Sequence, residues 1–280
     1  MKKLKAGFIG FLPADKDFDQ VEEILKNYAE IGYRGIELGD LLLQSPAPCE
    51  NLKKMKEWGM EPLCVMLPSV TDTGVVQKVI RDAGKIGVKR AASFGGCIAE
   101  YRFGMRPAEP DYDELMREVE KLNIIAKELL QEGIITSFHN HDMEFLTFYR
   151  GESAFEHMVK NSEYLKFELD CGWALYAHRD PVLLMEELGD KLCAVHIKDW
   201  GYGNVAWKGT GNEKEDSARR AMPHFTTPGT GTLPLGACLG KAAQMDIDYA
   251  IIEQDFMNYN NDQDTLRGAY LNMKETGYVD

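Results

Sequence analysis

Histidines and carboxylates lie near the ends of four short apolar segments in the second half of the chain. These side chains are His139, His141, Asp170, His196 and Glu253. Ionisable groups in buried parallel strands need an explanation, because both faces of such strands contact apolar side chains. Alternate residues of a strand share a face, so His139 and His141 are expected to point in the same direction.

A divalent cation is one explanation of this set. Imidazole and carboxylate ligands together suit Mn²⁺, Zn²⁺, Co²⁺ or Mg²⁺ better than a metal that prefers sulfur. A cation would also keep neighbouring carboxylates ionised, which would otherwise raise one another's pKa. From the residues alone, two other interpretations stay open: a buried hydrogen-bonded network, and unrelated surface groups.

The elements that position these residues alternate along the chain. Short apolar segments bounded by Gly, Pro, Asp or Asn are typical of buried parallel strands. They cover residues 6–11, 35–38, 62–67, 90–94, 134–141, 165–170, 192–198 and 249–255. Amphipathic patterns predict helices between them, most clearly over 111–132, where Asp111 and Glu114 form a capping box and Gly133 is the stop. Further helices are predicted over 17–31, 180–188 and 264–276.

Eight strand–helix units without a linker between them define the expected fold. Repeated βα units pair in parallel with right-handed crossovers, and eight of them in about 250 residues fit a (β/α)8 TIM barrel. We expect residues 1–280 to form one such domain. A doubly wound open sheet with an extra domain is the alternative, although no G-x-G-x-x-G follows the first strand. In a barrel the carboxyl ends of the strands converge on one mouth.

One connection is much longer than the others. Residues 199–236, which follow the seventh strand, are rich in Gly, Thr, Asn and charged side chains. A segment of this length in a compact domain is commonly a lid or binding loop, and a mobile surface insertion is the alternative. In a barrel it would lie over the mouth.

Composition and charge restrict the class of protein. The chain has 280 residues, 44% of them hydrophobic and 28% charged, with a formal net charge of −13. An acidic surface repels phosphodiester backbones, so we expect no nucleic-acid partner. No apolar run reaches the roughly 18 residues that span a membrane, so no membrane partner is expected. The six scattered cysteines predict reduced thiols and a cytoplasmic location, and a homo-oligomer is left open.

Five motifs follow one another in an order known from one superfamily. They are F-H-N-H-D-M-E-F at 138–145, L-D-C-G-W at 169–173, V-H-I-K-D at 195–199, P-G-T-G at 228–231 and I-E-Q-D at 252–255. On these motifs nearly the whole chain resembles the sugar phosphate isomerase/epimerase superfamily, the xylose isomerase-like TIM barrels. That superfamily includes ketose 3-epimerases, hydroxypyruvate isomerases, inosose dehydratases and endonuclease IV. The motifs are specific for the superfamily and not for one substrate.

The resemblance implies a single divalent metal, often Mn²⁺, at the ends of strands five to eight. Asp170, His196 and Glu253 match the ligands of strands six, seven and eight. On strand five most epimerases have a glutamate, which also acts in acid–base catalysis, and this sequence has His139. Either His139 replaces that ligand or Glu144 folds in from the loop; we expect His139 to hold the metal.

Further site residues follow from the same resemblance. Glu144 and His141 are candidates for proton transfer or substrate binding. The D-x-x-H motif of ketose epimerases reads Asp170-x-x-Trp173 here, so a substrate-binding histidine is missing and His178 is a candidate to replace it. Trp173 would stack on a sugar ring or pack beneath a lid, and the same alternatives apply to Trp200 and Trp207.

Two charged side chains near strand ends also have two interpretations each. Lys198 would neutralise a developing negative charge or bind an anionic substituent, or it is a solvated lysine. Glu37 would accept hydrogen bonds from sugar hydroxyls, or it forms a buried ion pair with a barrel lysine or arginine.

The resemblance and the metal chemistry predict an isomerase or epimerase that acts on a small-molecule sugar or cyclitol. The cation would stabilise the enediolate formed when a proton leaves the carbon next to a carbonyl, and Glu253 is the expected base. A dehydratase or lyase acting on a keto-sugar, an inosose or a 3-keto-glycoside is the second hypothesis. A catalytically silent sugar-binding barrel is the third.

Overall fold

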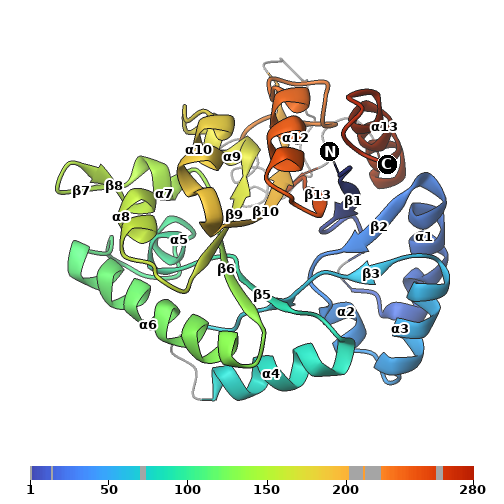
Figure 1. The fold of residues 1–280 in the computed structure, drawn as a ribbon, viewed down its shortest axis with the longest axis horizontal. Coiled ribbons are helices and arrows are strands. Elements are labelled where there is room, and N and C mark those ends of the chain that lie inside the picture. The colour runs from blue at the N-terminus through green and yellow to red at the C-terminus, as the bar shows by residue number, and fades with distance from the viewer. Residues whose placement is uncertain (1, 14, 70–73, 202–210, 212–221, 257–260) are drawn as a thin grey trace.

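A parallel sheet forms the centre of the molecule. The computed structural model describes residues 2–13, 15–69, 74–201, 211, 222–256 and 261–280. The strands of the sheet are β1 (Lys5–Phe8), β2 (Tyr33–Ile36), β3 (Glu61–Pro62), β4 (Val65–Met66), β5 (Arg90–Ser93), β6 (Ile135–His139), β9 (Lys166–Asp170), β10 (Leu192–Ile197) and β13 (Tyr249–Ile252). Their order is β3-β2-β1-β13-β10-β9-β6-β5-β4. Only Leu63 and Cys64 separate the two end strands of this order, so β3 and β4 form one barrel strand and the sheet closes (Figure 1).

The predicted (β/α)8 TIM barrel is thereby confirmed, and the open doubly wound sheet is excluded. Each of the eight predicted segments contains part of a barrel strand. The segments predicted over 134–141, 192–198 and 249–255 extend beyond the last paired residue, because the chain leaves the sheet after His139, Ile197 and Ile252. The polar residues just after those points therefore lie in the loops at the mouth.

Helices follow every barrel strand and surround the sheet (Figure 1). They are α1 (Phe18–Ile31), α2 (Asp40–Leu43), α3 (Pro48–Glu57), α4 (Val75–Ile86), α5 (Cys97–Arg102), α6 (Tyr112–Gln131), α7 (Met143–Leu146), α8 (Ala154–Lys160), α9 (Cys171–Tyr176), α10 (Pro181–Leu188), α12 (Leu235–Gln244) and α13 (Asp262–Glu275). The predicted capping box at Asp111 and Glu114 is present at the start of α6, and its apolar face is buried. None of the helices in the described parts of the chain is both long and apolar enough to cross a membrane.

The expected lid at 199–236 is described only at its two ends. Residues 202–210 and 212–221, with Trp207, lie outside the described residues. At the ends, β11 (Asp199–Trp200) pairs antiparallel with β12 (Phe225–Thr226). Two further strands, β7 (Phe148–Tyr149) and β8 (Glu152–Ser153), form a separate hairpin.

Asp199 fixes the return of this connection to the barrel. Its carboxylate accepts the backbone N–H groups of Trp200, Gly229, Gly231 and Leu233, each at 2.9 Å. A Cβ at Gly231 would overlap the Asp199 carboxylate and the Trp200 carbonyl, so the close approach requires glycine. The V-H-I-K-D and P-G-T-G motifs are thus two halves of one structural unit.

Candidate metal centre

Four predicted ligands meet at the carboxyl ends of four adjacent strands. His139 ends β6, Asp170 ends β9, His196 lies in β10 and Glu253 follows β13. One ligand atom from each residue lies within 4.8 Å of the others. His139, Asp170 and His196 are buried, and the Glu253 side chain is 19% exposed, so Glu253 is the accessible member of the group. We call these four residues the ligand cluster.

Two members of the ligand cluster, His139 and Asp170, have free donor atoms that fit a divalent cation. Neither ring nitrogen of His139 has a hydrogen-bond partner, and its Nε2 lies 3.9 Å from Asp170 Oδ2 and 3.8 Å from Glu253 Oε2. Asp170 Oδ1 accepts the Trp173 N–H at 2.8 Å, whereas Oδ2 has no hydrogen-bond partner. Burial and the neighbouring His196 hold the pKa of His139 well below its usual value, so the imidazole is neutral, the form that binds metals. Buried polar atoms without partners are costly, and a cation would satisfy them.

The structure brings His139, and not Glu144, into the ligand cluster. Glu144 lies in α7, where its buried Oε2 accepts the His141 N–H at 2.7 Å. Burial raises the pKa of Glu144 to about 7, a value suited to proton transfer near neutral pH. The His141 ring centroid is 5.1 Å from that of His139, and burial lowers the pKa of His141 to about 4.

Lys198 is buried among carboxylates, so the alternative of a solvated lysine is excluded. Its Nζ lies 2.7 Å from Asp255 Oδ2, 3.3 Å from Glu253 Oε2 and 3.4 Å from Asp170 Oδ2. Burial acts to lower the pKa of Lys198, but Glu253, Asp255 and Asp170 raise it, and the ammonium stays charged. The Trp173 ring centroid lies 4.8 Å from Nζ.

A small cavity of about 50 Å³ lies beside this lysine. His141, Trp173 and Asp255 line it, and neither Trp173 Nε1 nor His141 Nδ1 has a hydrogen-bond partner. Two buried donors or acceptors without protein partners could bind hydroxyl groups of a small ligand.

A buried ion-pair network supports His196 on its other side. Arg90 pairs with Glu37 and with Glu168, the latter at 2.6 Å, and His196 Nε2 contacts Glu37 and lies 3.2 Å from Glu168 Oε1. His196 Nδ1 lies 2.8 Å from Glu253 Oε2, so the two ring nitrogens face different carboxylates. For Glu37 the structure therefore shows the predicted alternative of a buried ion pair.

The sequence pattern did not predict Arg90 and Glu168 as parts of the site. Glu168 precedes Asp170 by two residues, so strand alternation places both on one face, and this signal could have found it. Arg90 begins an otherwise apolar segment, which is a weaker signal.

His178 and Trp200 lie elsewhere. His178 is exposed and lines a separate cavity of about 420 Å³ with Trp200 and Thr232. Among the described residues, no hydrogen bond or ion pair joins His178 to the ligand cluster. Trp200 packs with Trp173 and Phe225 and donates its Nε1–H to Gly172 O at 3.2 Å, which matches the packing interpretation.

The closed barrel and the ligand cluster at its mouth define a TIM-barrel protein with a candidate metal centre. Residues 25–270 match the model of the xylose isomerase-like TIM barrel family, and the chain belongs to this family. No curated protein matches the sequence.

Solved structures share the fold over nearly the whole chain. A sugar phosphate isomerase/epimerase from Parabacteroides distasonis is 17% identical with a TM-score of 0.69, covering 99% of this chain and 96% of that one. A probable 3-DHS dehydratase from Bacillus anthracis is 14% identical with a TM-score of 0.69, covering 97% and 99%. A 3-keto-D-glucoside 4-epimerase from E. coli is 14% identical with a TM-score of 0.66, covering 98% and 100%.

Proposed function

We propose that this protein is a metal-dependent isomerase or epimerase that acts on a sugar or cyclitol. The proposal depends on one observation: His139, Asp170, His196 and Glu253 offer ligand atoms within 4.8 Å of one another at the barrel mouth. Two proteins of similar fold support the choice of chemistry, since one is a sugar phosphate isomerase/epimerase and another is a 3-keto-D-glucoside 4-epimerase.

The ligand cluster would hold one divalent ion, with Mn²⁺ expected and Zn²⁺, Co²⁺ or Mg²⁺ as alternatives. Glu37, Glu168 and His196 form a second group with metal-ligand spacing, but the Arg90 guanidinium already lies between its carboxylates. When bound, the cation would act as a Lewis acid that stabilises negative charge on the substrate oxygens.

Glu253 is the proposed base that removes the proton next to the carbonyl. Burial acts to raise the pKa of Glu253, but Lys198 and His196 hold it well below its usual range, so the carboxylate is ionised. Lys198 would stabilise the enediolate, and Trp173 and His141 would bind substrate hydroxyls in the small cavity. Glu144 and His141 are the candidates for returning the proton, which gives an epimer or an isomer according to the carbon that receives it.

The first experiment separates proton transfer from metal binding. We expect Glu253→Gln to lower turnover by at least about 10²-fold, the contribution of a general base, while Mn²⁺ binding measured by calorimetry weakens much less. Asp170→Ala and His196→Ala should lose both properties, and Glu275→Gln on the exposed face of α13 is the matched control. Full solvent-deuterium incorporation into the substrate by Glu253→Gln would rule out this base.

A dehydratase remains the second candidate, and the position of Glu144 favours it. Epimerisation by two carboxylates needs one on each side of the reacting carbon, whereas the Glu144 carboxylate turns back to the His141 N–H. The fold is also shared by a probable 3-DHS dehydratase. Deuterium uptake without loss of water supports the epimerase, and a new absorbance from a conjugated enone supports the dehydratase. Absence of any stoichiometric divalent ion would favour a silent sugar-binding barrel.

A further inference from the structure

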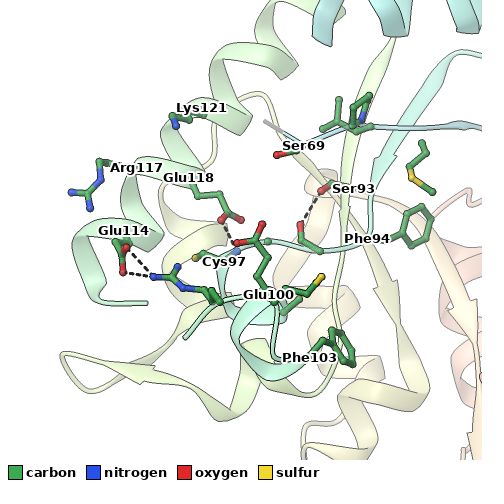
Figure 2. A pocket seen from close by; sticks show the side chains of 18 residues that line it. Ser69, Ser93, Phe94, Cys97, Glu100, Phe103, Glu114, Arg117, Glu118 and Lys121 are labelled. Carbon is green, nitrogen blue, oxygen red and sulfur yellow. Dashed lines mark hydrogen bonds and ion pairs between the residues drawn. The ribbon is translucent and has the colours of Figure 1, made fainter. Parts of the chain in front are cut away.

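A cavity of about 640 Å³ opens next to the ligand cluster and is used by none of the steps proposed above. It is lined by the ends of β4 and β5 and the residues after them, by α5 and by the first half of α6 (Figure 2). Its volume is in the range of pockets that hold ligands of drug size. No member of the ligand cluster lines it.

Two phenylalanine rings separate this cavity from the ligand cluster. The Phe94 ring lines the cavity and its centroid is 5.1 Å from that of His139. Phe103 lines both the large cavity and the small cavity beside Trp173, and its ring centroid is 6.5 Å from that of His141. The large cavity therefore lies one aromatic ring away from the ligand cluster.

The walls of the cavity combine apolar and polar side chains. Met66, Phe103 and Met105 are 46%, 51% and 69% exposed, and such large exposed apolar side chains around one hollow indicate a binding surface. On α6, Glu118 and Lys121 border the same hollow (Figure 2). An aromatic face beside carboxylate and ammonium groups can pack against a ring and hydrogen-bond its substituents.

Glu118 is held in place by the chain around it. Its Oε2 accepts the Cys97 N–H at 2.7 Å, and a Cβ at Gly96 would overlap its carboxylate. Gly96 thus lets the backbone approach the carboxylate, and Glu118 is a fixed part of the wall. The neighbouring Arg106 is held by both oxygens of Glu114 at 3.0 Å.

We propose that the large cavity binds a second ring attached to the substrate by a glycosidic bond. The substrate is then a glycoside of a keto-sugar and not a free monosaccharide. This inference rests on the proposed function, because it takes the first ring to lie at the ligand cluster. Three acidic side chains (Glu100, Glu114 and Glu118) and three basic ones (Arg106, Arg117 and Lys121) line the cavity, and Arg106 is already paired with Glu114. The lining therefore has no excess of positive charge that would select an anionic substituent. The second ring is a sugar or an aromatic group, and the experiment distinguishes them.

The test measures how tightly the Mn²⁺-loaded full-length protein binds probes with one ring and probes with two rings. The probes are methyl β-D-glucoside, methyl β-D-cellobioside and phenyl β-D-glucoside, which lack a free carbonyl and report binding alone. We expect at least one two-ring probe to bind about tenfold more tightly than methyl β-D-glucoside, because it buries a further ring face. A preference for the cellobioside indicates a sugar, and a preference for the phenyl glucoside indicates an aromatic group. Equal affinities, or no binding of the two-ring probes, overturn the proposal.

Variants locate the second ring. Phe103→Ala and Glu118→Gln should each remove most of the tenfold preference and leave Mn²⁺ affinity unchanged. Phe103 is half exposed, and glutamine keeps an acceptor for the Cys97 N–H, so both variants are expected to fold. The controls are Leu130→Ala and Glu128→Gln, at residues that are exposed on α6 and lie outside the cavity lining. A preference unchanged in both cavity variants overturns the proposal.

The two proposals fail in different ways. If the protein binds none of Mn²⁺, Zn²⁺, Co²⁺ and Mg²⁺ at the ligand cluster, the proposed function is wrong. If it binds Mn²⁺ and exchanges substrate protons but shows no ring preference, only the glycoside inference is wrong.

Discussion

An excess of negative charge distinguishes the ligand cluster and its surroundings from an ordinary buried polar network. Three cationic side chains, Arg90, Lys198 and His196, face a larger set of carboxylates. These carboxylates belong to Glu37, Glu168, Asp170, Glu253 and Asp255. Burial acts to lower the pKa of His196, but Glu37 and Glu168 raise it well above its usual value. Burial and the neighbouring Glu253 raise the pKa of Asp170 to about 6, although Lys198 opposes the shift. A bound cation would relieve this excess, which is why metal binding explains the residues better than hydrogen bonding alone.

Glu144 should make stability depend on pH. Its folded pKa of about 7 exceeds the ordinary value of 4.5, so the folded state binds more protons between these values and stability falls as pH rises through about 7. Glu144→Gln removes this dependence, and at pH 8 the variant should be more stable than the native protein by up to about 3 kcal/mol. Urea denaturation at pH 5 and pH 8 measures the difference, with Glu275→Gln as control. Parallel pH profiles for Glu144→Gln and the native protein would contradict the assignment.

Arg90 should be essential to the stability of the barrel interior. Arg90→Met leaves the buried Glu37 and Glu168 with His196 as their remaining cationic partner, and the loss of the guanidinium costs about 3–5 kcal/mol. Chemical denaturation at pH 7 measures the loss, and Arg81→Met, at a largely exposed arginine, is the matched control. Adding Glu168→Gln to Arg90→Met should recover part of the loss, since it removes one of the uncompensated charges. If the losses in unfolding free energy of the two single variants simply added in the double variant, the result would argue against an ion-pair network.

At the scale of elements, local chemistry made most boundaries predictable. The capping box at Asp111 and Glu114 and the glycine after the helix locate α6 within a residue or two, because these groups satisfy the free backbone groups at helix ends. The break between β3 and β4 was not predictable. It arises because β3 pairs with β2 and β4 pairs with β5, and the sequence of this segment does not show where one pairing ends and the other begins. The position of Glu144 was also not predictable, since a four-residue helix, α7, decides where its carboxylate points.

The contact between Asp199 and the P-G-T-G turn gives a prediction for this element. Gly231→Ala should lower stability by about 1–3 kcal/mol, because the methyl group displaces the Asp199 carboxylate from the N–H groups it accepts. Gly236→Ala is the control, since its Cβ would meet only Thr276 Cγ2 at 4.0 Å near the start of α12. Thermal melting of both variants checks the prediction. Equal melting temperatures would mean that the turn tolerates a side chain.

At the scale of the whole molecule, the order of strand–helix units was sufficient to predict the barrel. The contacts that form only when the sheet closes into that barrel could not be predicted from the sequence. Asp170, His196 and Glu253 were found through motifs that lie far apart in the chain. The partners of His196 in the ion-pair network come from β5, β9 and the residue after β2, which meet only when the sheet closes. No local sequence pattern predicts that Arg90, Glu37 and Glu168 form ion pairs and hydrogen bonds with one another and with His196.

Closure also means that a cation bound at the mouth should stabilise the entire fold. The ligand cluster joins β6, β9, β10 and the residue after β13, so its donor atoms come together only in the folded chain. An ion that binds the folded state alone stabilises it by about 2.7 kcal/mol at a concentration 100 times its Kd, which for a chain of this size raises Tm by about 5 °C or more. We expect Mn²⁺ to raise Tm by this amount, EDTA to reverse the shift, and Asp170→Ala to abolish it. If Mn²⁺ raised the Tm of Asp170→Ala by the same amount, the ion would bind elsewhere on the acidic surface. Binding that persists after a buried ligand is removed does not depend on the ligand cluster.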